Sequence, residues 1–199
     1  MDMTNVQRRV AIVIFDDVEV LDFCGPFEVF SVTGARQGRK PFVVHTVAED
    51  KRTIVARGGL RVEPDHTFDD CPSAEILLVP GGYGTRREMN NPRMLAWVKD
   101  KAANAELVLS VCSGALILGK AGLLDGLTAT THHRALDELR AISPRINVDA
   151  ARRFVDNGSV IVSAGISAGI DMSLYVVSRL LGKDQAADTA RYMEYEWRV

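Results

Sequence analysis

The chain contains 199 residues, of which 47% are hydrophobic and 25% are charged, and its formal net charge is −2. This profile is that of an average soluble globular domain, and it excludes intrinsic disorder, a coiled coil and a collagen-like repeat. The balanced charge predicts no nucleic-acid partner and no membrane partner, and no apolar run reaches the roughly 20 residues of a membrane span. Residues 1–9 lack the apolar core of a signal peptide, so we expect a cytoplasmic protein.

The first half of the chain alternates strand-like and helix-like patterns. Continuous apolar runs predict buried strands at residues 10–15, 42–47 and 76–79. Residues 23–32 are expected to form a helix with Pro26 in its first turn, where a missing N–H costs little. Residues 53–62, interrupted by Gly58 and Gly59, predict a small hairpin.

The second half continues the alternation. Helices are predicted over residues 92–103, 113–121, 136–142, 166–181 and 184–195, and a buried strand over 107–111. Short strands at 154–155 and 160–162 flank Asn157-Gly158, a strong hairpin signal. The pattern predicts one α/β domain over residues 1–199, with a doubly wound, mostly parallel sheet flanked by helices.

Cysteine and histidine are too sparse and too scattered to predict a disulfide framework or a metal site. No CxxC or HExxH motif is present, so we expect no metal and no cofactor. The residues concerned are Cys24, Cys71, Cys112, His45, His66, His132 and His133.

The strongest chemical signal is Cys112, at the junction between a buried strand and a small-residue helix. A side chain on such an elbow is presented at the top of a parallel sheet. Helix N-termini favour thiolate, so we expect Cys112 to have the lowest pKa of the three thiols. A buried structural cysteine is the alternative.

Two further features follow other strands of the predicted sheet. The backbone N–H groups of Gly81 and Gly82 could hold negative charge that develops on a substrate, although the turn could also be a plain one. Asp22 lies between Leu21 and Phe23, where burial would raise its pKa and suit it to proton transfer; the alternative is a helix N-cap.

His132 and His133 follow Thr130-Thr131, twenty residues after the cysteine. A histidine near Cys112 could form a Cys/His dyad by accepting the thiol proton. The doublet leaves open which ring points inward.

These motifs together resemble the DJ-1/PfpI (ThiJ) superfamily, which is related to class I glutamine amidotransferases. The matching segments are Leu21-Asp22 with Gly25-Pro26, Val79-Pro80-Gly81-Gly82, Val111-Cys112-Ser113-Gly114, Thr130-Thr131-His132 and Ala164-Gly165-Ile166-Ser167-Ala168-Gly169-Ile170-Asp171. The resemblance implies a flavodoxin-like fold and a homodimer.

Within the superfamily the chain is most similar to isonitrile hydratases, with Ser113 where those enzymes are expected to have Thr. The resemblance implies Cys112 as nucleophile, Asp22 as general acid and base, and Ser113 as a supporting hydroxyl. It implies a small-molecule substrate, and apolar residues near the elbow lead us to expect an apolar substituent on it. Another cysteine enzyme (an amidase, peptidase or glyoxalase/deglycase) and a small-molecule or redox sensor, like those of AraC-type regulators, are the alternatives.

Overall fold

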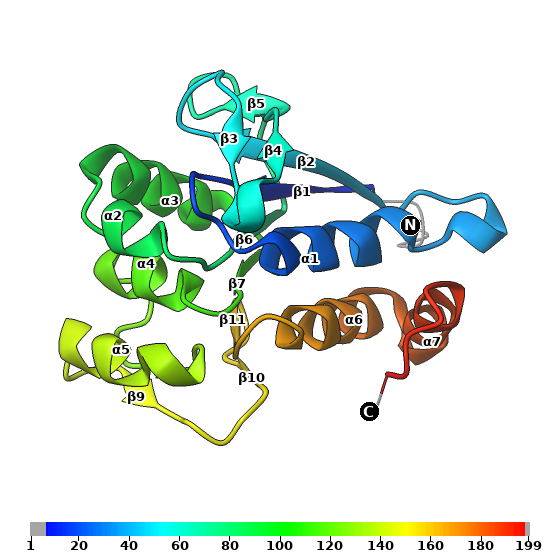
Figure 1. Ribbon diagram of the computed structural model, residues 1–199. Coiled ribbons are helices and arrows are strands. Elements are labelled where there is room, and N and C mark those ends of the chain that lie inside the picture. The colour runs from blue at the N-terminus through cyan, green and yellow to red at the C-terminus, as the bar shows by residue number, and fades with distance from the viewer. Residues whose placement is uncertain (1–6, 198–199) are drawn as a thin grey trace.

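The computed structural model describes residues 7–197, which contain a seven-stranded sheet (Figure 1). Its strands lie in the order β10-β11-β7-β6-β1-β2-β5. Every neighbouring pair is parallel except β10 and β11, which form an antiparallel hairpin at one edge. The strands are β1 (Arg8–Val13), β2 (Phe42–Ala48), β5 (His66–Thr67), β6 (Ile76–Val79), β7 (Leu107–Ser110), β10 (Phe154–Asp156) and β11 (Val160–Ser163).

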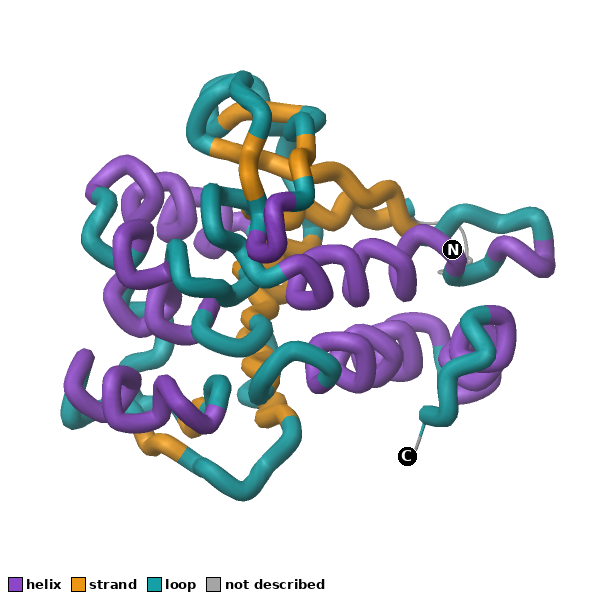
Figure 2. The backbone as a smooth tube through the Cα atoms, in the orientation of Figure 1, coloured by secondary structure: helices purple, strands orange, loops and turns teal. Residues whose placement is uncertain are grey.

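Helices cover both faces of the sheet, which confirms the predicted doubly wound architecture (Figures 1 and 2). One layer consists of α1 (Val20–Val32), α6 (Ala168–Leu181) and α7 (Lys183–Tyr192). The other consists of α2 (Thr85–Glu88), α3 (Pro92–Asn104), α4 (Gly114–Lys120) and α5 (Leu136–Ile142). All residues of β6 and β7 are buried, because a parallel sheet between two helical layers exposes neither face.

Two small sheets lie outside the main one. The predicted hairpin at residues 53–62 is confirmed as antiparallel β3 (Ile54–Val55) and β4 (Arg61–Val62), joined by a turn at Arg57–Gly59. The parallel pair β8 (Thr128–Ala129) and β9 (Asn147–Val148) was not expected. Strands of two residues carry too little periodicity to be recognised from sequence.

The prediction for Pro26 was wrong in one respect. Helix α1 begins at Val20, three residues earlier than expected, so Pro26 lies in the second turn. Proline has no N–H, and the carbonyl of Asp22 therefore lacks the usual helical partner four residues later. The helix tolerates this because the α1–α6 layer buries it on the sheet.

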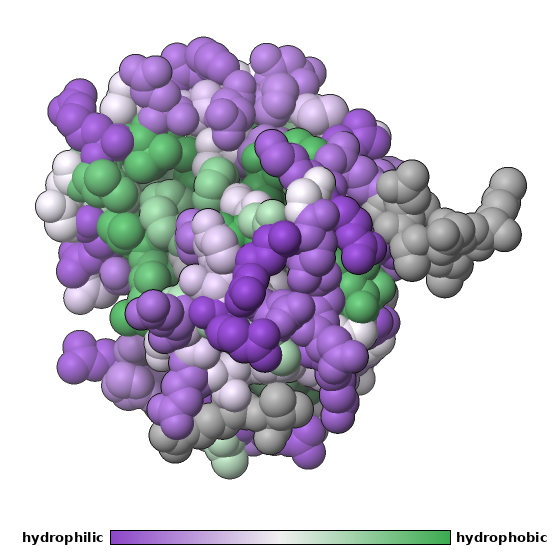
Figure 3. All heavy atoms as spheres, turned by 90° about the vertical axis from the view of Figure 1, so that its right-hand side faces the viewer, coloured by the Kyte–Doolittle hydropathy of each residue, from purple (hydrophilic) through white to green (hydrophobic). Residues whose placement is uncertain are grey.

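No helix within residues 7–197 is long and apolar enough to cross a membrane. Figure 3 shows the side of the molecule on which α7 and the first described residues lie. Hydrophilic side chains cover most of this face, and apolar ones gather toward one side of the view.

Candidate active site

Cys112 lies at the elbow between β7 and α4, as predicted, in a strained backbone conformation. Its φ angle is +57°, in the left-handed region, which costs an L-residue roughly 1–2 kcal/mol. Hydrogen bonds to both backbone polar groups of Cys112 hold this conformation: its N–H donates to the carbonyl of Ala164 (3.0 Å), and the Thr131 side-chain hydroxyl donates to its carbonyl (2.7 Å). A backbone so fixed by neighbouring segments is typical of functional positions.

This strain leads to a stability prediction. Glycine adopts positive φ without penalty, so Cys112→Gly is expected to be more stable than Cys112→Ala by about 1 kcal/mol. Urea unfolding of the two variants, followed by circular dichroism, measures the difference. If the alanine variant is the more stable one, the left-handed strain at this position is not real.

Asp22 faces Cys112 from the first turn of α1. Its side chain is fully buried. The Gly81 N–H donates to its Oδ2 atom (3.0 Å), and Oδ1 is buried with no hydrogen-bond partner among the described residues. The residue that caps α1 is Glu19, so the structure does not favour the helix-cap interpretation of Asp22.

The two groups influence each other's protonation. Burial raises the pKa of Asp22 to about 7, although the hydrogen bonds from Gly81 and Cys112 oppose the rise. Burial, followed by the charge of Asp22, raises the pKa of the Cys112 thiol to about 12. Between these two values the pair holds one proton, and that proton can be on sulfur or on the carboxylate.

The expectation that Cys112 would have the lowest thiol pKa is therefore not met. Burial also raises the pKa of Cys24 and of Cys71, but neither thiol has a buried carboxyl group beside it. Helix α4 begins only at Gly114, and the backbone N–H groups of Ser113 and Ile166 only partly offset the loss of solvent around the Cys112 sulfur. A thiol in this environment needs a neighbouring base to become nucleophilic.

The Gly81-Gly82 turn has a different role from the one we expected. The Gly81 N–H binds Asp22, and the Gly82 N–H donates to the Ser113 hydroxyl (3.0 Å). Both N–H groups thus already have acceptors, and they do not form the expected pair of donors for substrate charge. The N–H groups of Ser113 and Ile166 are the ones that reach the Cys112 sulfur.

Only glycine fits at position 81. A Cβ atom there would lie 2.5 Å from the Ser113 nitrogen and 2.8 Å from Asp22 Oδ2. The absence of a side chain thus lets the β6 turn approach both the elbow and the carboxyl group. Ser113 in turn holds this turn: its hydroxyl also donates to the Gly82 carbonyl and accepts a hydrogen bond from the Thr85 hydroxyl.

His132 lines the same cavity as Cys112, but no hydrogen bond joins the two side chains in the described part of the chain. Its Nδ1 atom accepts a hydrogen bond from the Arg134 N–H (3.2 Å), so the basic nitrogen of the neutral ring is bound to the backbone and not to the thiol. Burial, and then the charges of His133, Arg134 and Arg86, lower the pKa of His132. The structure therefore favours Asp22 over His132 as the partner of Cys112.

The site opens into a cavity of about 300 Å³. Apolar surface from residues such as Tyr83, Ala135 and Ile166 lines it, as we expected near the elbow, and charged side chains line it as well. The lining residues that the sequence did not suggest are Glu19, Arg57, Tyr83, Arg86, Arg134, Ala135 and Ile166. Of these, only Ile166 carries a backbone signal, a φ of +46°, and that angle is invisible in the sequence.

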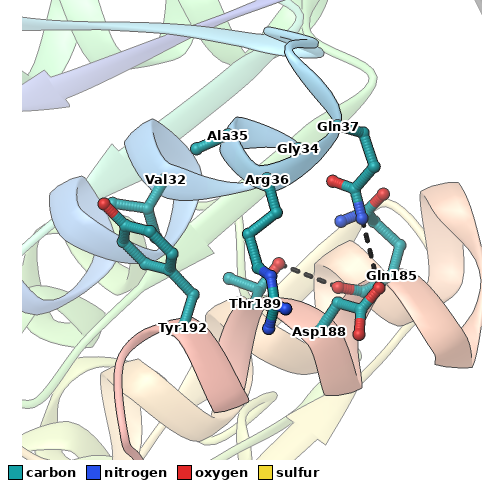
Figure 4. A pocket seen from close by; sticks show the side chains of 9 residues that line it. All are labelled: Val32, Gly34, Ala35, Arg36, Gln37, Gln185, Asp188, Thr189 and Tyr192. Carbon is teal, nitrogen blue, oxygen red and sulfur yellow. Dashed lines mark hydrogen bonds between the residues drawn. The ribbon is translucent and has the colours of Figure 1, made fainter.

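A second hollow lies between the end of α1 and α7 (Figure 4). Tyr192 lies beside Val32 there, and the Gln37 amide donates to Asp188 (3.1 Å). It encloses no space for a water molecule, so it is a packing contact. The described residues also contain no group of three or more His, Cys, Asp and Glu side chains that could hold a metal ion.

Comparison with known proteins places this arrangement in a family. The chain is 36% identical over 190 residues to the isonitrile hydratase of Pseudomonas putida, covering 94% of this chain and 78% of that enzyme. It is 26% identical to the HTH-type transcriptional regulator GbdR of Pseudomonas aeruginosa over 95% of this chain, which spans about half (51%) of the regulator.

Among solved structures, a THiJ/PfpI family protein from Pseudomonas syringae matches with a TM-score of 0.86 and 30% identity, covering all of this chain and 81% of that one. The model of the DJ-1/PfpI family matches residues 8–179, from the start of β1 into the last turn of α6. The chain therefore belongs to the DJ-1/PfpI family.

Proposed function

We propose that this protein is a cysteine-dependent, isonitrile hydratase-like enzyme that adds water to an isocyanide and releases an N-substituted formamide. The observation that carries the proposal is the fully buried Asp22 carboxyl group facing Cys112, whose pKa of about 7 lets it take up and release a proton near neutral pH. The similarity to the Pseudomonas putida isonitrile hydratase over 94% of the chain supports the same reaction class.

The reaction begins with the one-proton state of the pair. Asp22 takes the thiol proton while the Cys112 sulfur attacks the terminal carbon of R–N≡C, and Asp22 then gives that proton to the same carbon. The product of this step is a covalent thioimidate, R–N=CH–S–Cys112.

Water completes the reaction. Asp22 removes a proton from water as the oxygen adds to the thioimidate carbon, and the nitrogen takes up that proton. The carbon–sulfur bond then breaks and the proton of the new hydroxyl returns through Asp22 to sulfur, which leaves R–NH–CHO. The sum is one isocyanide and one water giving one formamide, with no cofactor required.

The test is incubation of the purified protein with isocyanides, glyoxals and amides in parallel, with products followed by proton NMR. We expect a formamide signal from the isocyanides that is absent with Cys112→Ala. Turnover of a glyoxal or an amide, with none of any isocyanide, would instead assign another cysteine-dependent reaction. The match to GbdR keeps a sensor role as the second candidate; it would be favoured by tight ligand binding without turnover.

The proton shared by Asp22 and Cys112 determines how kcat/KM depends on pH. Because the pKa of Asp22 is about 7 and that of Cys112 about 12, the reactive one-proton state forms as the pH rises through 7. On a neutral isocyanide, kcat/KM is expected to rise about tenfold per pH unit below pH 7 and to level off above it. Initial rates between pH 5.5 and 9.5 measure the profile. A rate that falls as the pH rises through 7 would mean that the doubly protonated pair is the active form.

A further inference from the structure

The walls of the cavity at Cys112 carry more positive than negative charge. Three arginines and one glutamate line it: Arg57, Arg86, Arg134 and Glu19. The Arg86 guanidinium is neutralised by two hydrogen bonds to Glu138, which is not part of the lining. Among residues 7–197, Arg57 and Arg134 form no ion pair, so the lining contains two arginines without an acidic partner and one glutamate.

The first of these cations is held in place at the mouth of the cavity. The Arg57 backbone N–H donates to the Val18 carbonyl (2.9 Å), and Val18 also forms an isolated antiparallel β-bridge with Gly82. The Arg57 guanidinium lies 3.9 Å from the centre of the Tyr83 ring. Stacking on an aromatic ring leaves the guanidinium edges free to donate hydrogen bonds.

The second cation belongs to a different part of the chain. Arg134 follows His132 in the turn before α5, and its backbone N–H binds the His132 ring. The β3–β4 hairpin and this turn thus supply one arginine each to the lining of a single cavity. A carboxylate accepts two parallel hydrogen bonds from a guanidinium, which makes it a geometrically matched partner for arginine.

Resting on the proposed hydratase function, we infer that the natural substrate is an isocyanide bearing a carboxylate, which Arg57 and Arg134 bind while Cys112 attacks the isocyano carbon. A carboxylate on the substrate offers both guanidinium groups a hydrogen-bond acceptor, which an apolar substituent does not. Glu19 favours a substrate with a single negative charge, because its carboxylate repels a second one.

The experiment compares isocyanoacetate and 4-isocyanobenzoate with their neutral methyl esters. The wild-type kcat/KM is expected to be about tenfold or more higher for each anion than for its ester, and to fall as salt is added. Arg57→Gln and Arg134→Gln should each lower kcat/KM for an anion about tenfold more than for its ester. The loss should be mainly in KM, because the contact is present before and during the reaction.

Arg61→Gln is the matched control. Arg61 is exposed on β4 of the same hairpin as Arg57 but does not line the cavity. This variant removes the same charge, and kcat/KM should stay at the wild-type value for both the anions and the esters. Esters turned over as fast as the anions, with both arginine variants like wild type, would overturn the carboxylate inference while the hydratase function stands.

Failure of the hydratase function itself gives a different result, because neither anions nor esters would then be hydrated. The carboxylate inference is then decided by protection of Cys112 from iodoacetamide, read by peptide mass spectrometry. N-formylglycine should slow the labelling in wild type but not in Arg57→Gln, and N-formylglycine amide should protect neither. Equal protection by the acid and the amide would overturn the inference.

Discussion

Cys112→Ala is expected to abolish hydration of every isocyanide that the wild-type protein accepts. The scheme passes through a carbon–sulfur bond to this residue, and no other thiol is near: Cys24 lies half-buried on α1 and Cys71 is buried close to His45. Formamide production followed by proton NMR measures the loss. Intact-mass spectrometry of wild type, quenched during turnover, should show the mass of the substrate added to the protein and should show none with the variant.

Controls separate the loss of chemistry from the loss of structure. Cys24→Ala and Cys71→Ala remove thiols of the same size and should retain activity. The melting temperature of Cys112→Ala should stay near that of wild type, because the substitution removes one sulfur atom and leaves the clamped backbone in place. Wild-type activity in Cys112→Ala would end the covalent scheme.

Asp22→Asn is expected to lower kcat about 10²–10⁴-fold, the usual contribution of general acid–base catalysis. Asparagine keeps the shape and can still accept the hydrogen bond from the Gly81 N–H, but it cannot carry the thiol proton to carbon. His132→Ala should cost much less, because the His132 ring already accepts a hydrogen bond at Nδ1 and does not bond to the thiol. Initial rates of both variants on one neutral isocyanide measure the contrast.

A severe defect in His132→Ala beside a nearly normal Asp22→Asn would reverse the assignment and favour the Cys/His dyad. The pH profile gives a second readout. The rise in kcat/KM through pH 7 should vanish in Asp22→Asn, since the group whose deprotonation produces it is gone. A merely structural role of the carboxyl group would leave that rise in place.

The same substitution should also stabilise the protein above neutral pH. A carboxyl group whose pKa rises from 3.8 to about 7 on folding binds its proton more tightly in the native state, so the free energy of unfolding decreases as the pH rises from about 4 to 7. This cost is at most about 4 kcal/mol. Urea unfolding at pH 5 and pH 8 should show the advantage of Asp22→Asn growing with pH; an inactive but more stable variant is the mark of a functional residue.

The apolar runs by themselves determined the fold. Residues 76–79 and 107–111 have no polar alternation, and only a sheet covered on both faces buries such strands. The direct passage from the second of these runs into small residues likewise placed Cys112 at the edge of the sheet. Both conclusions depend on neighbours in sequence, and local pattern is sufficient for them.

Only the tertiary structure decided what surrounds the Cys112 sulfur. Asp22 and Cys112 are ninety residues apart in the sequence, and they meet because β1, β6 and β7 are adjacent and parallel. The same packing gives the Gly81 and Gly82 N–H groups to Asp22 and Ser113. It also removes water from the thiol, which reverses the expected direction of its pKa shift. Burial and hydrogen-bond partners are properties of the packed layers, and no local stretch of sequence contains them.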